Sequence, residues 1–71
     1  MKAKVEYHSG WMLIIEKETN APLLFLEYLS NFPAPTNILH KVIDNQFGVL
    51  KIRLNGTKED YLKIAEYINN N

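Results

Sequence analysis

The first residues of the chain form two short runs with the hydrophobic pattern of β-strands. Residues 4–8 alternate polar and apolar positions, and residues 11–16 are mostly apolar. Ser9 and Gly10 separate the two runs, and glycine tolerates the positive φ that a two-residue hairpin loop demands. The pattern therefore predicts that the chain begins with a β-hairpin.

The spacing of apolar residues changes to a helical period after Asn20. Apolar side chains recur at this spacing at Phe25, Leu26, Leu29 and Phe32. Pro22 suits a first helical turn because the N–H that it lacks would have no partner there, and Asn20 is a suitable cap. Pro33 and Pro35 cannot continue the helix. We therefore expect a helix over about residues 22–31.

Two further strands are predicted in the second half of the chain. Residues 36–43 are rich in β-branched side chains, and residues 44–46 form a polar connection to residues 47–55. In this last run Leu50, Ile52 and Leu54 alternate with Val49, Lys51 and Arg53. Such alternation is typical of a sheet with one buried face and one wetter face.

A second helix is predicted to end the chain. Thr57 and Asp60 stand at the spacing of a capping box. Apolar side chains then recur on one helical face at Tyr61, Ile64, Ala65 and Ile68. The order of elements is therefore ββαββα.

Length and composition favour one small globular domain over residues 1–71. A chain of 71 residues buries only about 60% of the surface that its unfolded form exposes. With 46% hydrophobic and 23% charged residues, it lies in the ordinary range of packed proteins. It has no cysteine, and small domains without disulfides or metal often gain stability by pairing with a copy of themselves. We therefore expect a homodimer.

Charge and hydropathy argue against nucleic acid and membranes as partners. Eight basic and eight acidic residues cancel, so net charge gives no general attraction to nucleic acid or anionic lipid. The start of the chain lacks the continuous apolar core of a secretory signal or a membrane span. A cytoplasmic location, with no nucleic acid and no membrane span, is the expectation.

Two short motifs resemble one known family. They are the Asn-Ile-Leu triplet at residues 37–39 and the Phe-Gly-Val-Leu run at residues 47–50. Together with Ala-Pro-Leu-Leu at 21–24, Asp44, Gly56-Thr57 and Asp60, the chain resembles the NIL domain of methionine-importer ATPases and some ferredoxins over residues 12–69. The resemblance implies a noncatalytic regulatory domain of ferredoxin-like topology that binds a sulfur amino acid between two copies.

The order of elements departs from that of the family in one respect. NIL domains run βαββαβ, whereas this chain is predicted to run ββαββα and lacks the last strand. In a ferredoxin-like sheet the last strand lies antiparallel beside the first, which is where the hairpin would place residues 4–8. We therefore predict an α+β, ferredoxin-like fold with a four-stranded antiparallel sheet and two helices on one face. Its N-terminal hairpin strand replaces the usual last strand.

The resemblance also points to a ligand site around Asn37. An asparagine amide offers donors and an acceptor to the carboxylate and ammonium groups of an amino acid such as methionine. A thioether side chain needs a small apolar pocket, for which the candidates are Ile38, Leu39, Leu23 and Leu24. The structural alternatives are that Asn37 tolerates a bend after Pro35 and that the apolar residues are plain core.

Gly48 and Phe47 are further candidates for the ligand site. Gly48 lets a ligand approach the backbone closely, or it marks a β-bulge after a turn. Phe47 either covers the edge of the pocket or packs at the start of a strand.

A second hypothesis is a structural interaction module without a ligand. On the outer sheet face Met12, Ile14 and Val49 would leave an apolar patch, and such patches mark partner surfaces. Trp11 is either an anchor of that interface or a cover of the small core.

Other chemistry finds no support in the sequence. His8 and His40 lie on separate predicted strands without further ligands at metal-site spacing, so neither a metal nor another cofactor is expected. No residue set provides a nucleophile with a positioned base, so the chain is not expected to be an enzyme. An RNA-recognition motif needs more aromatic residues than the run at 47–51 contains.

Overall fold

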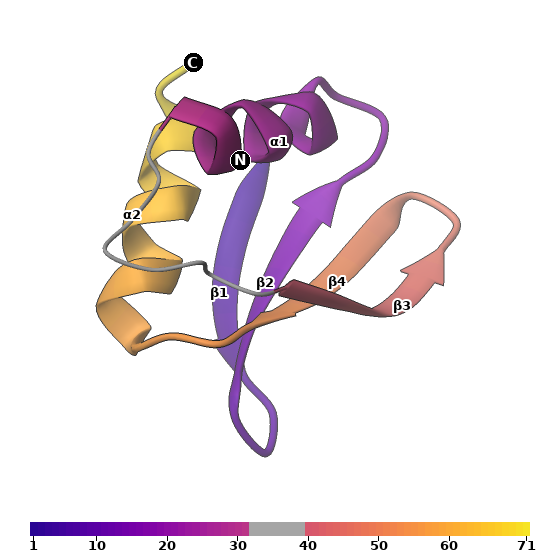
Figure 1. Ribbon diagram of the computed structural model, residues 1–71. Helices are drawn as coiled ribbons and strands as arrows, with labels where there is room; N and C mark the ends of the chain where they lie inside the picture. The colour runs from indigo at the N-terminus through magenta and orange to yellow at the C-terminus, as the bar shows by residue number, and fades with distance from the viewer. Residues whose placement is uncertain (32–39) are drawn as a thin grey trace.

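The computed structural model describes residues 1–31 and 40–71. Six elements lie in these ranges: β1 (Ala3–Tyr7), β2 (Trp11–Glu16), α1 (Ala21–Asn31), β3 (His40–Gln46), β4 (Val49–Leu54) and α2 (Lys58–Asn69). Their order is the predicted ββαββα (Figure 1).

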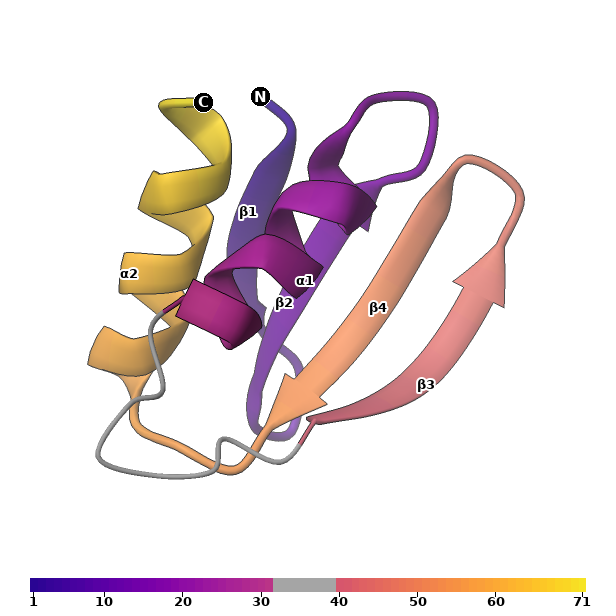
Figure 2. The same ribbon diagram turned by 45° about the horizontal axis from the view of Figure 1, so that its top comes forward.

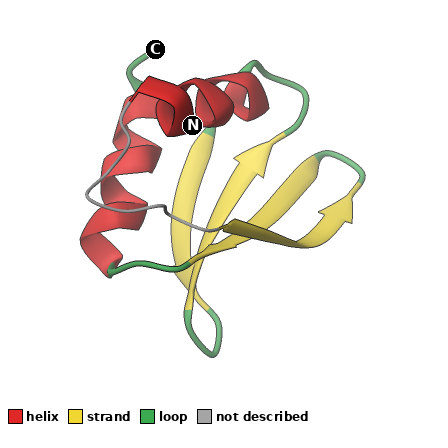
Figure 3. Cartoon of the chain, in the orientation of Figure 1, coloured by secondary structure: helices red, strands yellow, loops and turns green. Residues whose placement is uncertain are grey.

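The strands form one antiparallel sheet with the order β1-β2-β4-β3. Both helices lie on the same face of this sheet, as Figures 1 and 3 show. The hairpin strand β1 lies antiparallel beside β2, in the place of the last strand of a ferredoxin-like sheet. The fold is therefore ferredoxin-like, and the predicted replacement of the last strand is confirmed.

The core lies between the sheet and the two helices. Because alternate residues of a strand face opposite sides, β2 and β4 each send one set of side chains towards the helices. The largest fully buried side chains are Leu13, Ile15, Ile52, Ile64 and Ile68. Each such side chain contributes about 1.5–3 kcal/mol relative to an exposed one.

Both helices begin with a side-chain oxygen that accepts from a backbone N–H group without a partner inside the helix. At α2 the predicted capping box is confirmed, since Asp60 N–H donates to Thr57 Oγ1 and Thr57 N–H donates to Asp60 Oδ2 at 2.7 Å. At α1 the Asn20 carbonyl accepts from Leu24 N–H, but the capping side-chain oxygen comes from Thr19, which accepts from Ala21 N–H at 3.1 Å.

The boundary between β3 and β4 differs from the prediction. The expected connection at residues 44–46 belongs to β3, and Phe47 and Gly48 form the turn instead. The register shifts between Val42 and Asp44, and residues 44–46 pair with β4 because an edge strand tolerates polar side chains. Gly48 takes the positive φ of 87° that the turn requires. Residues 36–39 of the predicted strand lie outside the described residues.

Candidate functional site

An apolar pocket of about 140 Å³ lies between α1 and the half of the sheet that β4 and β3 form. Its lining residues are Pro22, Phe25 and Leu26 of α1, Val42 of β3, and Leu50 and Ile52 of β4. Helix α1 packs on β2, and β3 lies farthest from both helices (Figure 2). The helix-facing side of β3 is therefore incompletely covered, which leaves Leu26 55% exposed and Val42 47% exposed.

The size and lining of this pocket restrict what it can hold. Small-molecule sites usually measure about 300–1,000 Å³. A pocket of about 140 Å³ lined only by apolar residues has room for one apolar side chain and offers a charged group no partner. Any polar recognition must therefore come from groups outside this lining.

The centre of the predicted ligand site lies outside the described residues. This applies to Asn37, Ile38 and Leu39, so their part in a ligand site stays a prediction. In the sequence the triplet directly precedes β3, the strand that contributes Val42 to the pocket.

The described members of the predicted site do not line the pocket. Leu24 is 7% exposed and belongs to the core, whereas its neighbour Leu23 is 60% exposed. Phe47 is 97% exposed in the β3–β4 turn rather than packed at a strand start. At Gly48 an added Cβ would meet no atom within 4 Å, so the backbone there is open to approach.

Sequence reasoning missed the residues that do line the pocket. Phe25 and Leu26 were assigned to the apolar stripe of the first helix, and Val42 to a strand with no assigned role. No local pattern distinguishes a covered apolar residue from one beside an uncovered strand. The pocket follows from the distance between α1 and β3, which only the packing sets.

The outer face of the sheet exposes less apolar surface than was expected. Met12 and Ile14 lie there, but each is only 7% exposed, and Val49 is half-buried. In the register Ile14 stands between Lys4 and Lys51, whose aliphatic stems can cover it. The interface role of Met12, Ile14 and Val49 stays a prediction.

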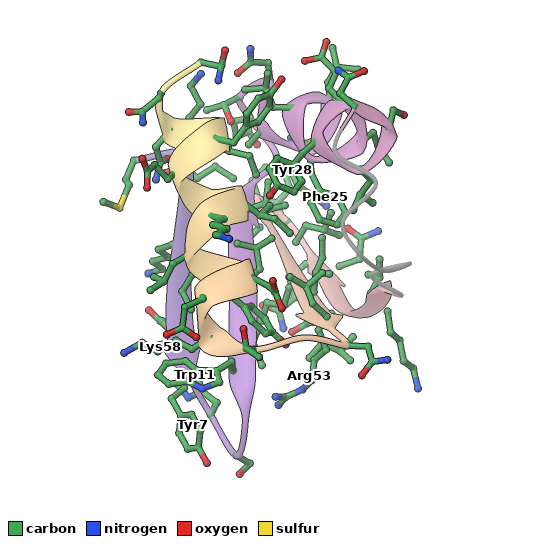
Figure 4. The ribbon with its side chains drawn as sticks, turned by 60° about the vertical axis from the view of Figure 1, so that its left-hand side comes forward. Tyr7, Trp11, Phe25, Tyr28, Arg53 and Lys58 are labelled. Carbon is green, nitrogen blue, oxygen red and sulfur yellow. The ribbon has the colours of Figure 1, made fainter. Side chains whose placement is uncertain are left out.

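Trp11 lies on the helix side of the sheet, at the rim of the core. Its ring meets the Tyr7 ring edge to face with centroids 5.0 Å apart, and Lys58 Nζ lies 5.0 Å from its centroid (Figure 4). Trp11 also packs against the core cluster, as its structural alternative predicted. An additional role as an interface anchor stays a prediction.

Arg53 holds the β1–β2 turn in place. Its guanidinium donates to the Trp11 carbonyl at 3.0 Å and to the His8 carbonyl at 2.8 Å. The loop has three residues between the paired Tyr7 and Trp11 rather than two. Gly10 has φ 130°, which side chains rarely allow, so the turn favours glycine there. A Cβ at this position would also displace the Arg53 guanidinium, whose Nη1 lies 2.5 Å from it.

A small charged group on the outer face gives a test by titration. Glu6 accepts a 2.8 Å hydrogen bond from His8 Nε2 and pairs with Lys4 Nζ at 3.0 Å. These two partners, His8 first, lower the pKa of the Glu6 carboxyl below its ordinary value. A lowered folded-state pKa means that the pair stabilises the fold above the ordinary pKa and loses this effect as pH falls through the lowered value.

Substituting His8→Ala is expected to raise the pKa of Glu6 towards its ordinary value, because the first of the two stabilising partners is gone. The measurement is a carboxyl NMR titration of Glu6. Lys41→Ala, which removes an exposed cation on β3 at the opposite edge of the sheet from β1, is the matched control and is expected to leave that pKa unchanged. An unaltered Glu6 titration in His8→Ala would contradict the assignment.

The described residues contain neither a metal-binding cluster nor a helix that could span a membrane. Within residues 1–31 and 40–71, no three side chains of the types His, Cys, Asp and Glu gather closely enough to hold a metal ion. None of the helices described is long and apolar enough to cross a membrane.

Comparisons with known proteins identify no relative. No family model matches the chain, and neither a curated protein nor a solved structure does. What the fold and the pocket define is a class: a small ferredoxin-like α+β domain with an apolar pocket beside an incompletely covered edge strand.

Proposed function

We propose that this chain is a noncatalytic ligand-binding regulatory domain that recognises methionine or a related amino acid at the interface of two copies. The observation that carries the proposal is the apolar pocket between α1 and β3, which has room for one apolar side chain. The thioether side chain occupies this pocket. Asn37, three residues before β3 in the sequence, binds the ammonium and carboxylate groups.

The exposure around the pocket supports the second copy. Leu26 and Val42, which line the pocket, are 55% and 47% exposed, and Ile43, the next residue after Val42, is 39% exposed. A second copy that covers these side chains removes apolar surface from water and closes the mouth of the pocket. Ligand and partner then stabilise one another, which is the physical basis of a ligand-dependent assembly.

The test is calorimetry with methionine on three variants. Leu26→Glu places a charge in the pocket and Asn37→Ala removes the amide, so both are expected to lose the heat of binding. The matched control is Ser30→Glu, which adds the same charge one turn further along α1 at an exposed position outside the pocket lining. It is expected to bind as the unaltered chain does.

A melting experiment provides the independent measurement. Methionine at ten times its Kd stabilises the folded state by about 1.4 kcal/mol, which raises the Tm of a domain of this size by roughly 6–11 °C. If millimolar methionine produces neither heat nor a higher Tm, the sensing proposal fails.

The exposed apolar residues also favour a second candidate, a protein–protein interaction module without a ligand. Under this reading Leu26→Glu lowers the mass measured by light scattering, whereas methionine has no effect on any variant. Under the first reading both the mass and the heat of binding respond to Leu26→Glu.

A further inference from the structure

The outer edge of β1 presents backbone groups that β2 does not use. The Lys2 carbonyl accepts from Glu16 N–H at 2.9 Å. The backbone N–H and C=O groups of the even-numbered residues of β1 therefore point towards β2. In an antiparallel pair the alternate residues turn their N–H and C=O groups the other way. The backbone groups of Ala3, Val5 and Tyr7 therefore point outwards.

One of these three positions is already paired with a side chain. The Asn69 amide of α2 accepts from Ala3 N–H at 2.9 Å and donates to the Ala3 carbonyl at 2.8 Å. These are the two bonds that a neighbouring strand would make with Ala3. In the part of the chain that the structure describes, nothing pairs with the outward backbone groups of Val5 and Tyr7.

A groove runs beside this edge, between β1 and α2, with a volume of about 500 Å³. Val5, Leu62 and Ala65 give it an apolar wall, and Lys4, Glu66 and Asn69 lie at its polar side. Leu62 is 45% exposed, whereas Ala65 is buried and only 7% exposed. The volume falls within the about 300–1,000 Å³ typical of ligand sites.

We propose that this groove binds an extended peptide segment by β-strand addition to β1. The peptide backbone pairs with the free N–H and C=O groups of Val5 and Tyr7, and one apolar side chain enters the groove between Val5 and Leu62. Its neighbours in the peptide face the charged Lys4 and Glu6 side of the sheet, so they are polar. Main-chain pairing beside a helix with a pocket for alternate side chains is an established mode of peptide recognition.

The edge does not suit a second copy of the same strand. A symmetric antiparallel pair centred on Val5 would set Tyr7 of one copy opposite Ala3 of the other, whose backbone groups Asn69 already occupies. A pair centred on Glu6 or on Lys4 would set like charges directly opposite each other, which is destabilising. The free groups therefore match an unlike, short and extended segment.

The test is an NMR titration of the isotope-labelled protein with a blocked pentapeptide of alternating threonine and valine. The Val5 and Tyr7 amide signals are expected to shift, and their hydrogen exchange to slow. A peptide N-methylated at its central valine cannot donate there and is expected to bind about tenfold more weakly. This comparison leaves the protein unaltered.

Two proline variants locate the edge that is used. Val5→Pro removes an outward N–H without breaking the ladder to β2, so it is expected to weaken binding about tenfold. The matched control is Asn45→Pro on the other edge strand. Lys17 N–H donates to the Gly48 carbonyl, so the backbone groups of the even-numbered β4 residues point towards β2. Leu50 is one of these residues, so its partner Asn45 on β3 has a backbone N–H that points outwards, away from β4. Asn45→Pro is expected to bind normally.

Three outcomes would overturn the proposal. They are an absence of shifts at Val5 and Tyr7 at millimolar peptide, equal binding of the N-methylated peptide, and a doubled mass that Val5→Pro abolishes. The last would assign the edge to a second copy. Should Val5→Pro fail to fold, Leu62→Lys at the half-exposed groove wall takes its place, and unaltered binding to it would contradict the proposal.

Discussion

Replacing Ile64 by alanine is expected to lower the free energy of unfolding by about 2–5 kcal/mol. Ile64 has no exposed surface and lies in the core cluster between α2 and the sheet. A folded domain of this length has a stability of roughly 4–11 kcal/mol. The loss is therefore a large share of the total, and thermal melting is expected to show a Tm lower by roughly 10 °C or more.

The matched control is Leu62→Ala on the same helix. Leu62 is 45% exposed, so its truncation is expected to cost about 1 kcal/mol or less. Equal melting temperatures for Ile64→Ala and the unaltered protein would mean that α2 does not pack on the sheet as described.

Replacing Tyr61 by phenylalanine is expected to cost about 2–4 kcal/mol, although only one oxygen is lost. The Tyr61 hydroxyl accepts from Leu54 N–H at 2.9 Å and donates to the Leu54 carbonyl at 3.0 Å, and both bonds are buried. Leu54 lies two residues beyond Ile52, the last β4 residue that pairs with β2, so the hydroxyl takes the place of a strand partner. Without it two backbone groups remain buried and unpaired.

Chemical denaturation measures this loss, and Tyr7→Phe controls for the substitution. Tyr7 is 63% exposed, so water hydrates its hydroxyl in both the folded and the unfolded state. The expected change in the free energy of unfolding is within about 0.5 kcal/mol. If Tyr61→Phe denatures at the same midpoint as the unaltered chain, water reaches Leu54 and the bond is not needed.

The two proposed binding sites lie at opposite edges of the sheet. The apolar pocket adjoins β3, and the peptide groove adjoins β1. Val5→Pro and Leu62→Lys alter no residue of the pocket lining, and Leu26→Glu alters none of the groove, so a failure of methionine binding says nothing about strand addition, and the reverse also holds.

Much of the fold could be predicted because local sequence patterns determine the helices and strands. The period of two in residues 49–54 and the helical stripe from Tyr61 to Ile68 both match the buried residues of β4 and α2. The capping box at Thr57 was also predicted, since both of its bonds join residues three positions apart. The predicted end of β3 was wrong, because β3 is an edge strand, where the polar side chains of residues 44–46 stay at the surface while their backbone pairs with β4.

The candidate sites could be predicted only in part. Leu24 was proposed for a ligand site and belongs to the core, because one turn of a helix contains both covered and uncovered apolar residues. The bond between Asn69 and Ala3 joins residues 66 positions apart, and no local signal announces it. The same holds for Arg53 and the turn at His8.

By itself the sequence determined the types and order of the elements and, through the tight turn at Ser9 and Gly10, the place of β1 beside β2. These features depend on interactions between near neighbours and on which face of each element is apolar. Only the tertiary structure decided which apolar residues stay uncovered and which edge backbone groups stay unpaired. Both depend on the distances between elements, which arise when the whole chain packs.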